Sequence, residues 1–415
     1  MPELVRSERT IRRYRSESIF QWLCFGSIAI TAVFLVFLIA SLAVKAIPAL
    51  SQNAVTLAIK IDPEKVDAAS IAAGDFPAML KDSMASLFPE AKDKSEIKKV
   101  TKLISSSVVE DLQRKVTADP TLIGKTITVN APLTADADSY LKGIQATISP
   151  TGYNSDFEET ALKNLQKKGA VQRQFAWSLF TNGDSRAPEK AGMLGAFMGS
   201  LYTILITLVL ALPLGVAAAL YLEEFARKNR FTDLVEVNIN NLAAVPSIIF
   251  GLLGLAVFLN IFGLPRSSPL VGGLVLALLV LPTIIITARA ALRSVPPSIK
   301  EAALSVGASH QQAIFHHVLP LAMPGILTGT ILSVARALGE SAPLLMIGMV
   351  AFIADVPTRI TDAATAMPVQ VYLWSSLPEA AFRSRTSVAI LALLIMLLCL
   401  NALAIWMRKR FERRW

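Results

Sequence analysis

The sequence predicts an α-helical polytopic membrane protein with six transmembrane helices and an α+β domain between the first and the second. Hydrophobic residues make up 53% of the 415 residues, against about 45–50% in a soluble domain. They gather into six runs of the roughly 20 residues that cross a bilayer as a helix. Charged residues are only 17% of the chain and lie mostly between these runs. A soluble enzyme and a disordered or fibrous chain are thereby excluded.

The six apolar runs mark the expected transmembrane helices: 19–47, 196–222, 235–262, 271–290, 321–353 and 386–407. An arginine-rich head precedes the first run, as in a secretory signal peptide. The run is longer than the roughly 7–15 apolar residues of such a peptide. We therefore expect an uncleaved anchor helix over residues 19–47.

Basic residues flank the runs unevenly and predict the orientation of the chain. They concentrate in the head, in 227–230, in 289–300 and in 408–414, which lie on one side of the membrane if there are six spans. Since such residues stay in the cytoplasm, both termini are expected there, as a basic tail over 1–18 and a short tail over 411–415. This placement accounts for the net charge of +9 without a nucleic-acid partner.

Residues 48–191 are then expected outside, as a periplasmic domain. Residues 51–190 hold equal numbers of acidic and basic residues, and the segment is long enough to bury a core. Residues 55–61 and 126–129 alternate like strands. Residues 95–116 and 155–177 read as helices, the second opened by a capping box of Ser155 and Glu158.

Cysteine and histidine predict no metal centre. Cys24 and Cys399 lie in apolar runs, which excludes a disulfide framework and a cysteine-based zinc site. His310, His316 and His317 have no carboxylate at ligand spacing, so a polar cytosolic surface is the better interpretation. No nucleophile–base constellation is present, so we expect no enzyme and no bound cofactor.

Residues 293–320, between the fourth and fifth runs, are neither a span nor an ordinary loop. Pro296 and Pro297 break the incoming helix, and Ser298 can cap a short new one. A second short helix is expected from Ser309, ending before Pro320. A short helix of small residues on the inner face suits a groove on a cytoplasmic partner. The residue types alone favour such docking and a plain amphipathic loop about equally.

The same segment resembles the EAA motif of ABC-importer permeases, Glu-Ala-Ala-x₃-Gly-x₉-Ile-x-Leu-Pro. The matching residues are Glu301, Ala302, Ala303, Gly307, Leu319 and Pro320, and His317 in the aliphatic position is the one departure. The resemblance implies that 192–410 is an ABC permease core holding the second to sixth spans. It also implies that the coupling region 293–320 rests in a cleft of a separate ATPase subunit.

Further segments resemble the PstA-type permeases of phosphate ABC importers. They lie in 200–224, in 244–252 and, most specifically, in Ala335-Arg-Ala-Leu-Gly-Glu-Ser-Ala-Pro-Leu-Leu345. The resemblance implies an inner-membrane phosphate permease that works with a second homologous permease and a periplasmic phosphate-binding protein. Two partner ATPase subunits would hold the ATP and magnesium. The remaining alternatives are an importer of another oxyanion and a membrane-anchored phosphate sensor.

Arg336 and Glu340 are the candidate substrate-pathway residues. They lie four residues apart in an apolar run, which predicts one shared helix face. Ionisable groups at that depth cost at least about 2.5–3.5 kcal/mol each and face a partner or an aqueous path. One interpretation is a structural salt bridge. In the other, Glu340 orients Arg336, whose planar fork of donors binds a passing oxyanion; the family resemblance also implicates Arg336 in transport.

Three other residues are candidates for helix packing and gating. We expect Gly339 to let helices pack closely and Pro343 to loosen the helix where it rearranges. Pro246 is expected to mark a broken or kinked third span. Four aromatic residues near expected span ends, Trp22, Tyr372, Trp374 and Trp406, are expected to anchor the protein at the membrane interfaces.

Overall fold

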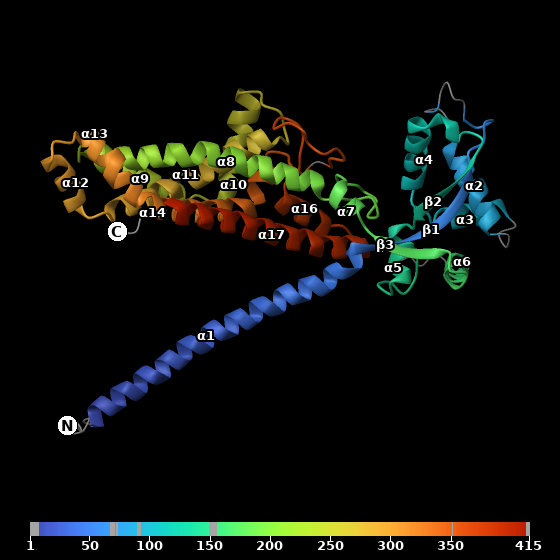
Figure 1. The fold of residues 1–415 in the computed structure, drawn as a ribbon, viewed down its shortest axis with the longest axis horizontal. Coiled ribbons are helices and arrows are strands. Elements are labelled where there is room, and N and C mark those ends of the chain that lie inside the picture. The colour runs from blue at the N-terminus through green and yellow to red at the C-terminus, as the bar shows by residue number, and fades with distance from the viewer. Residues whose placement is uncertain are drawn as a thin grey trace.

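The computed structural model describes residues 8–66, 71, 74–88, 93–148, 156–350 and 352–411. Most of the predicted head 1–18 is included, whereas 412–415 and the predicted cap at Ser155 lie outside the described residues. Figure 1 shows a long N-terminal helix, a bundle of helices and a mixed domain at one end of the bundle. We call this end of the bundle the domain end, and the opposite end, which carries α12 and α13, the coupling end.

Helix α1 (Glu8–Ala46) leads through the 3₁₀ turn η1 (Ile47–Leu50) directly into the domain. It diverges from the bundle and meets α17 near its own C-terminal end (Figure 1). None of the side chains in its most apolar stretch is buried. Because an apolar surface of this length is unfavourable in water, α1 fits a lipid or partner-subunit environment.

The domain is built on a three-stranded antiparallel sheet in the order β2-β1-β3. Its strands are β1 (Ser51–Lys60), β2 (Thr126–Pro132) and β3 (Val171–Phe175). Val55 in the central strand pairs with Ala131 and with Val171. The helices around it are α2 (Phe76–Leu87), α3 (Lys94–Thr101), α4 (Ser107–Ala118), the short 3₁₀ turn η3 (Pro120–Leu122), α5 (Ala135–Leu141) and α6 (Asp156–Lys167).

The core of this domain is apolar and continuous, with Leu57, Phe76, Met84 and Leu112 among its fully buried side chains. Two predicted helices are corrected here. The helix expected over 155–177 ends at Lys167, since Gly169 takes φ +69 and stops it, and 171–175 pair as a strand. The helix expected over 95–116 is interrupted, because the amide of Ser105 donates to the carbonyl of Pro132.

The bundle begins after the short helix α7 (Ser178–Thr181). Its long helices are α8 (Leu194–Leu220), which continues as the π-helix η4 (Tyr221–Phe225), then α11 (Pro269–Arg293), α14 (Leu319–Gly339) and α17 (Ala380–Phe411). The shorter ones are α9 (Arg230–Ala243), α10 (Ser247–Leu253), the π-helix η5 (Gly254–Ile261), α12 (Pro297–Ser305), α13 (His310–Ala313), the π-helix η6 (Ile314–Val318), α15 (Ala342–Met346) and α16 (Met367–Ser375).

Within the described residues, five helices are long and apolar enough to cross a membrane. The third predicted span, 235–262, is a pair of helices, α9 and α10–η5, bent by 104° at the break that contains Pro246, where the sequence predicted a broken or kinked span. The count reaches six when this pair is taken as one span. The fifth predicted span, 321–353, ends at Gly339, because Pro343 has no N–H with which to continue the helical ladder.

Small residues let α11 pack at the centre of the bundle. A Cβ on Gly273 would lie 2.6 Å from Ile206, and a Cβ on Gly329 would lie 2.2 Å from the Thr287 hydroxyl. Thr207 adds a hydrogen bond of 3.2 Å to the carbonyl of Gly273. These contacts bring α8, α11 and α14 close together, as is typical of membrane helices with small interfacial residues.

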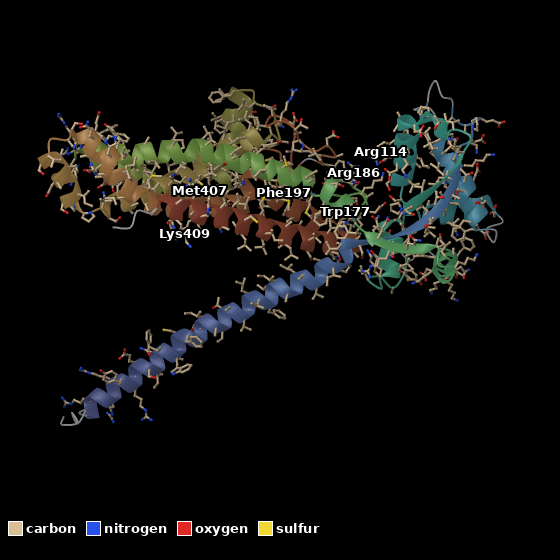
Figure 2. All side chains as sticks on the ribbon, viewed as in Figure 1. Arg114, Trp177, Arg186, Phe197, Met407 and Lys409 are labelled. Atoms are coloured by element: carbon tan, nitrogen blue, oxygen red, sulfur yellow. The ribbon has the colours of Figure 1, made fainter. Side chains whose placement is uncertain are left out.

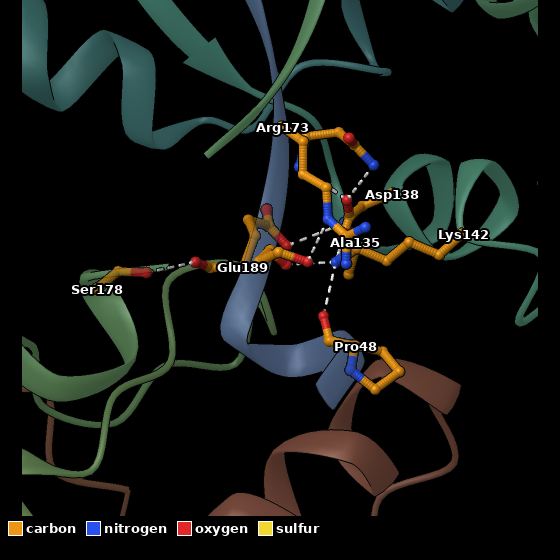
Figure 3. A network of polar contacts seen from close by, with 9 residues as sticks. Pro48, Ala135, Asp138, Lys142, Arg173, Ser178 and Glu189 are labelled. Atoms are coloured by element: carbon orange, nitrogen blue, oxygen red, sulfur yellow. Dashed lines mark hydrogen bonds and ion pairs between the residues drawn. The ribbon is translucent and has the colours of Figure 1, made fainter. Parts of the chain in front are cut away.

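Buried polar contacts hold the domain against the bundle (Figure 3). The Glu189 carboxylate accepts hydrogen bonds from the Ser105 hydroxyl at 2.9 Å and the Ala135 amide at 3.3 Å. Lys142 pairs with Asp138 and donates to the carbonyl of Pro48 at 2.8 Å. These charges are satisfied by partners from both sides of the junction, so they fix the base of the domain.

One carboxyl at this junction is expected to weaken the folded state at neutral pH. Burial raises the pKa of Asp136 above its usual 3.8, and Glu189 and Glu379 add to the shift. A carboxyl with a raised folded-state pKa opposes folding once the pH rises through its ordinary value. Asp136→Asn is therefore expected to raise the thermal unfolding midpoint at neutral pH. Scanning fluorimetry of the solubilised chain measures this.

The gain from Asp136→Asn is expected to vanish near about pH 4, where the unfolded carboxyl is itself protonated. Asp111→Asn is the matched control, because Asp111 in α4 is partly exposed and pairs with Arg114 at the surface. A lower midpoint for Asp136→Asn at neutral pH would contradict the prediction.

Candidate functional site

Arg336 and Glu340 lie together at the end of α14 nearer the domain. Arg336 is in the last turn of α14, where a cation is favoured by the helix dipole. The spacing predicted that Glu340 would share a helix face with Arg336, but Glu340 is the residue that caps the helix, with an extended ψ of 117°. The Arg336 Nε still lies 3.7 Å from the Glu340 Oε1. The two charges thus face each other beyond hydrogen-bonding distance.

The Arg336 side chain points away from its own bundle. It is 55% exposed, whereas Glu340 is 22% exposed. Leu332, one turn earlier, is 65% exposed, while Ala337 and Leu338 face the bundle and are buried. Arg336 therefore belongs to an open face of α14 that no described part of this chain covers. Its guanidinium keeps free donor positions after contacting Glu340, which suits an anion.

The predicted role of Gly339 in close packing is not seen within this chain. A Cβ added there would meet no described atom within 4 Å. The close approach occurs instead at Gly251 in α10, where a Cβ would lie 2.7 Å from the Cα of Pro343. Pro343 is buried in the first turn of the separate helix α15, so it does not loosen a continuous span.

Replacing Gly251 by alanine is expected to destabilise the bundle by about 1–3 kcal/mol, because the new methyl group would overlap the Pro343 backbone. The thermal unfolding midpoint of the solubilised chain should fall accordingly. Gly339→Ala is the matched control and should leave that midpoint near the wild-type value, since its methyl group would point into open space. Equal midpoints for the two variants would count against this contact.

The predicted coupling region forms two short helices, α12 and α13, joined by a turn at the coupling end (Figure 1). In α12, Ala303 is buried, whereas Glu301 and Ala302 are exposed. Gly307 takes φ +91, a conformation that favours glycine, and turns the chain from α12 toward α13. The exposed face of α12 therefore presents Glu301 and Ala302 to whatever lies beyond this end of the bundle.

The sequence predicted a short helix that ends before Pro320, but no helix ends there. The chain is helical from His310 to Gly339 through α13, η6 and α14. The π-helical turn η6 lies directly before Leu319 and Pro320. The regular α-helical hydrogen-bonding pattern is therefore already interrupted at the point where Pro320 has no N–H to donate. The coupling region and the span that carries Arg336 are thus one continuous helical element.

An ion-pair network, which the sequence reasoning did not single out, ties α12 to the end of α8. Glu224 pairs with Lys300 in α12 at 2.5 Å. Glu223 pairs with Arg293 at 2.8 Å and with Arg289 at 3.3 Å. Arg289 also reaches Glu236 in α9 at 2.9 Å. Consecutive acidic residues at the end of an apolar run, with basic residues at the end of another, were the sequence signal for it.

The three histidines lie at this end of the bundle. His310 Nε2 lies 3.1 Å from the carbonyl oxygen of Glu224, and its ring packs edge-on against Phe225. His316 and His317 are exposed. Among the described residues, no three His, Cys, Asp or Glu side chains are grouped to hold a metal ion.

Two family descriptions match separate parts of the chain. Residues 7–150 match a domain of unknown function, DUF3333. Residues 211–415 match the binding-protein-dependent transport system inner membrane component family. The solved structure titled as inward-facing conformations of the MetNI methionine ABC transporter matches with a TM-score of 0.42 and 18% identity, over 53% of this chain and 98% of that one.

Curated relatives match between about two fifths and three fifths of the chain. The phosphate transport system permease protein PstA of Haemophilus influenzae is 31% identical over 54% of this chain and 78% of its own length. PstA 1 of Mycobacterium tuberculosis is 32% identical over 59% of this chain and 80% of its own. A probable ABC transporter permease protein of Bacillus subtilis, YqgI, is 34% identical over 41% of this chain and 58% of its own.

Proposed function

The chain belongs to the family of PstA-type phosphate transport system permeases of ABC importers, and from this premise we propose that it carries inorganic phosphate through the inner membrane. In this role it forms half of the translocation pathway with a second, homologous permease. The observation that carries the proposal is the open face of α14, where Arg336 is exposed and contacts Glu340.

The chemistry of this face suits an oxyanion. A guanidinium is permanently charged and offers a planar fork of donors that matches two oxygens of a phosphate. Glu340, 3.7 Å away, can orient the guanidinium and draw it back after the anion leaves. Because the charges are not locked in a short pair, the anion need not displace a strong salt bridge. Arg336 can therefore attract the anion without binding it too tightly to release it.

Coupling to ATP is assigned to α12. Its exposed residues, Glu301 and Ala302, would rest in a cleft of a partner ATPase, one of two in the complex. ATP-driven closure of the ATPases would move α12, and the continuous helix from His310 to Gly339 would carry that movement to Arg336. ATP and magnesium would be bound by those ATPases, so this subunit needs no cofactor.

The orientation follows from the same assignment. The coupling end would face the cytoplasm, together with both termini, and the domain end would face the periplasm. A periplasmic phosphate-binding protein would deliver the anion at the domain end. The sheet domain lies at this end of the bundle (Figure 1), so it would stand beside that delivery site.

Uptake of radiolabelled phosphate at micromolar concentration tests the proposal, in cells that lack their own copy of the gene. The wild-type chain, expressed with its partners, is expected to restore uptake, and excess sulfate or molybdate is expected not to compete. If the complex assembles but sulfate or molybdate competes fully, the protein is a permease for another oxyanion. No transport of any oxyanion by an assembled complex would overturn the assignment.

A further inference from the structure

Three aromatic side chains are exposed where the sheet domain joins the bundle. Trp177 is 68% exposed, Phe175 is 47% exposed and Phe180 is 36% exposed. The Phe175 ring lies 4.8 Å from that of Trp177 and 5.8 Å from that of Phe180. Figure 2 shows Trp177 between the bundle and the domain. We call these three residues the aromatic patch.

The local backbone directs the three aromatic side chains of the patch toward the surface. Ala176 and Leu179 alternate with the patch residues in sequence and are buried. The Ala176 amide donates to the carbonyl of Leu50 at 3.0 Å. Leu179 packs in one apolar cluster with Ala49 and Phe382. Ala176 and Leu179 thus face the interior, and the three rings lie on the surface.

The level of the patch along the bundle matches a membrane interface. Leu179 lies in one cluster with Phe382 near the start of α17, and the exposed Trp406 lies near the other end of α17. Phe382 and Trp406 are 24 residues apart in sequence, a distance of about 36 Å along a helix. A hydrocarbon core is roughly 30 Å thick, and about 40–45 Å with its headgroup regions. The two levels therefore fall at opposite headgroup regions.

The patch also continues the surface of α1. Phe175 in β3 pairs with Ser51, the residue directly after η1, and Ile47 in η1 is 55% exposed. Trp22, toward the other end of α1, is 70% exposed. Lys45 in the last turn of α1 and Arg173, two residues before Phe175 in β3, are exposed, and such cations favour a headgroup layer.

From these observations we propose that the aromatic patch inserts into the headgroup region of the bilayer at the domain end. This goes beyond phosphate transport, since it assigns a lipid-binding surface to the segment that joins the domain to the bundle. Tryptophan and other aromatic rings are enriched at this depth, because their bodies are apolar and their edges can be wet. The patch thereby holds β3, and with it the sheet, at a fixed height above the membrane.

Quenching of tryptophan fluorescence by brominated lipids tests the proposal. The full-length chain, assembled with its partners, is reconstituted in vesicles of phosphatidylethanolamine and phosphatidylglycerol brominated near the carbonyl end of the acyl chains. The contribution of Trp177 is the wild-type spectrum minus that of Trp177→Phe. We expect it to lose most of its intensity in brominated vesicles and to be only weakly quenched by iodide in the water.

Trp374→Phe provides the matched control. Trp374 is 1% exposed and donates to the carboxylate of Asp184 at 2.9 Å, so its difference spectrum should resist both quenchers. Strong quenching of Trp177 by iodide without quenching by lipid would show a water-exposed patch and overturn the proposal. Resistance of Trp177 to both quenchers would show that a partner protein covers it, which would also overturn the proposal. Neither result would bear on phosphate uptake.

Discussion

Phosphate uptake is expected to fall at least about tenfold when Arg336 is replaced by alanine, because hydrogen bonds to a charged group contribute about 1.5–3 kcal/mol. Arg336 is exposed on the open face of α14 and is not part of the packed core. The substitution should therefore leave the amount of assembled complex unchanged. Initial uptake rates, normalised to membrane-inserted protein, measure the effect.

The conservative variant separates the two interpretations of the pair. Arg336→Lys keeps the positive charge but loses the planar fork, so we expect uptake between that of alanine and wild type. Glu340→Gln removes the carboxylate and should lower the rate less than Arg336→Ala does. If Glu340→Gln and Arg336→Ala were equally inactive and also assembled poorly, the pair would be a structural salt bridge instead.

An arginine outside the pathway gives the matched control for Arg336. Arg114 lies on α4 of the sheet domain and its side chain is 80% exposed; Figure 2 shows it well away from the coupling end. Arg114→Ala should retain wild-type uptake. Full uptake by both alanine variants would contradict the role given to Arg336.

Reversing the charge of Glu224 is expected to uncouple ATP hydrolysis from transport. Two cations about 4 Å apart repel by roughly 4 kcal/mol at the effective dielectric near a protein surface, and Glu224→Lys would face Lys300. The side chain of Glu224 is only 11% exposed, so water would screen this repulsion poorly. The end of α8 would separate from α12, and uptake should be lost while the ATPases still hydrolyse ATP.

The charge swap tests whether this pair itself is responsible. Glu224→Lys combined with Lys300→Glu restores opposite charges and should recover a large part of the uptake. Lys228→Glu is a suitable control, since Lys228 is exposed at the same end of the bundle and should tolerate reversal. A doubly substituted protein as inactive as Glu224→Lys alone would show that position 224 acts through another contact.

The sequence predicted the long apolar helices and the family well, because span length and motif spacing are local properties of the chain. The ends of elements were less predictable. The fifth span ends at Gly339 and not near residue 353, and Trp374, expected at an interface, is buried against the Asp184 carboxylate. Apolar composition alone does not distinguish a residue that faces lipid from one that faces the bundle.

The site was predictable in part for the same reason. The spacing of Arg336 and Glu340 indicated that they would meet, and they do, although Glu340 lies beyond the helix. The pairs of Glu223 and Glu224 with Arg289, Arg293 and Lys300 join segments more than 60 residues apart. Sequence periodicity carries no information about such contacts, which depend on how the helices pack.

The hydrogen bond between Leu50 and Ala176 brings the entrance and the exit of the sheet domain together. A unit whose two ends meet can be inserted into a host chain without displacing what comes before or after it. The match at 7–150 takes in α1 and the domain as far as α5, whereas the match at 211–415 begins within α8. Because its two ends meet between Leu50 and Ala176, a permease could gain or lose the sheet domain in one step while the helices on either side keep their arrangement.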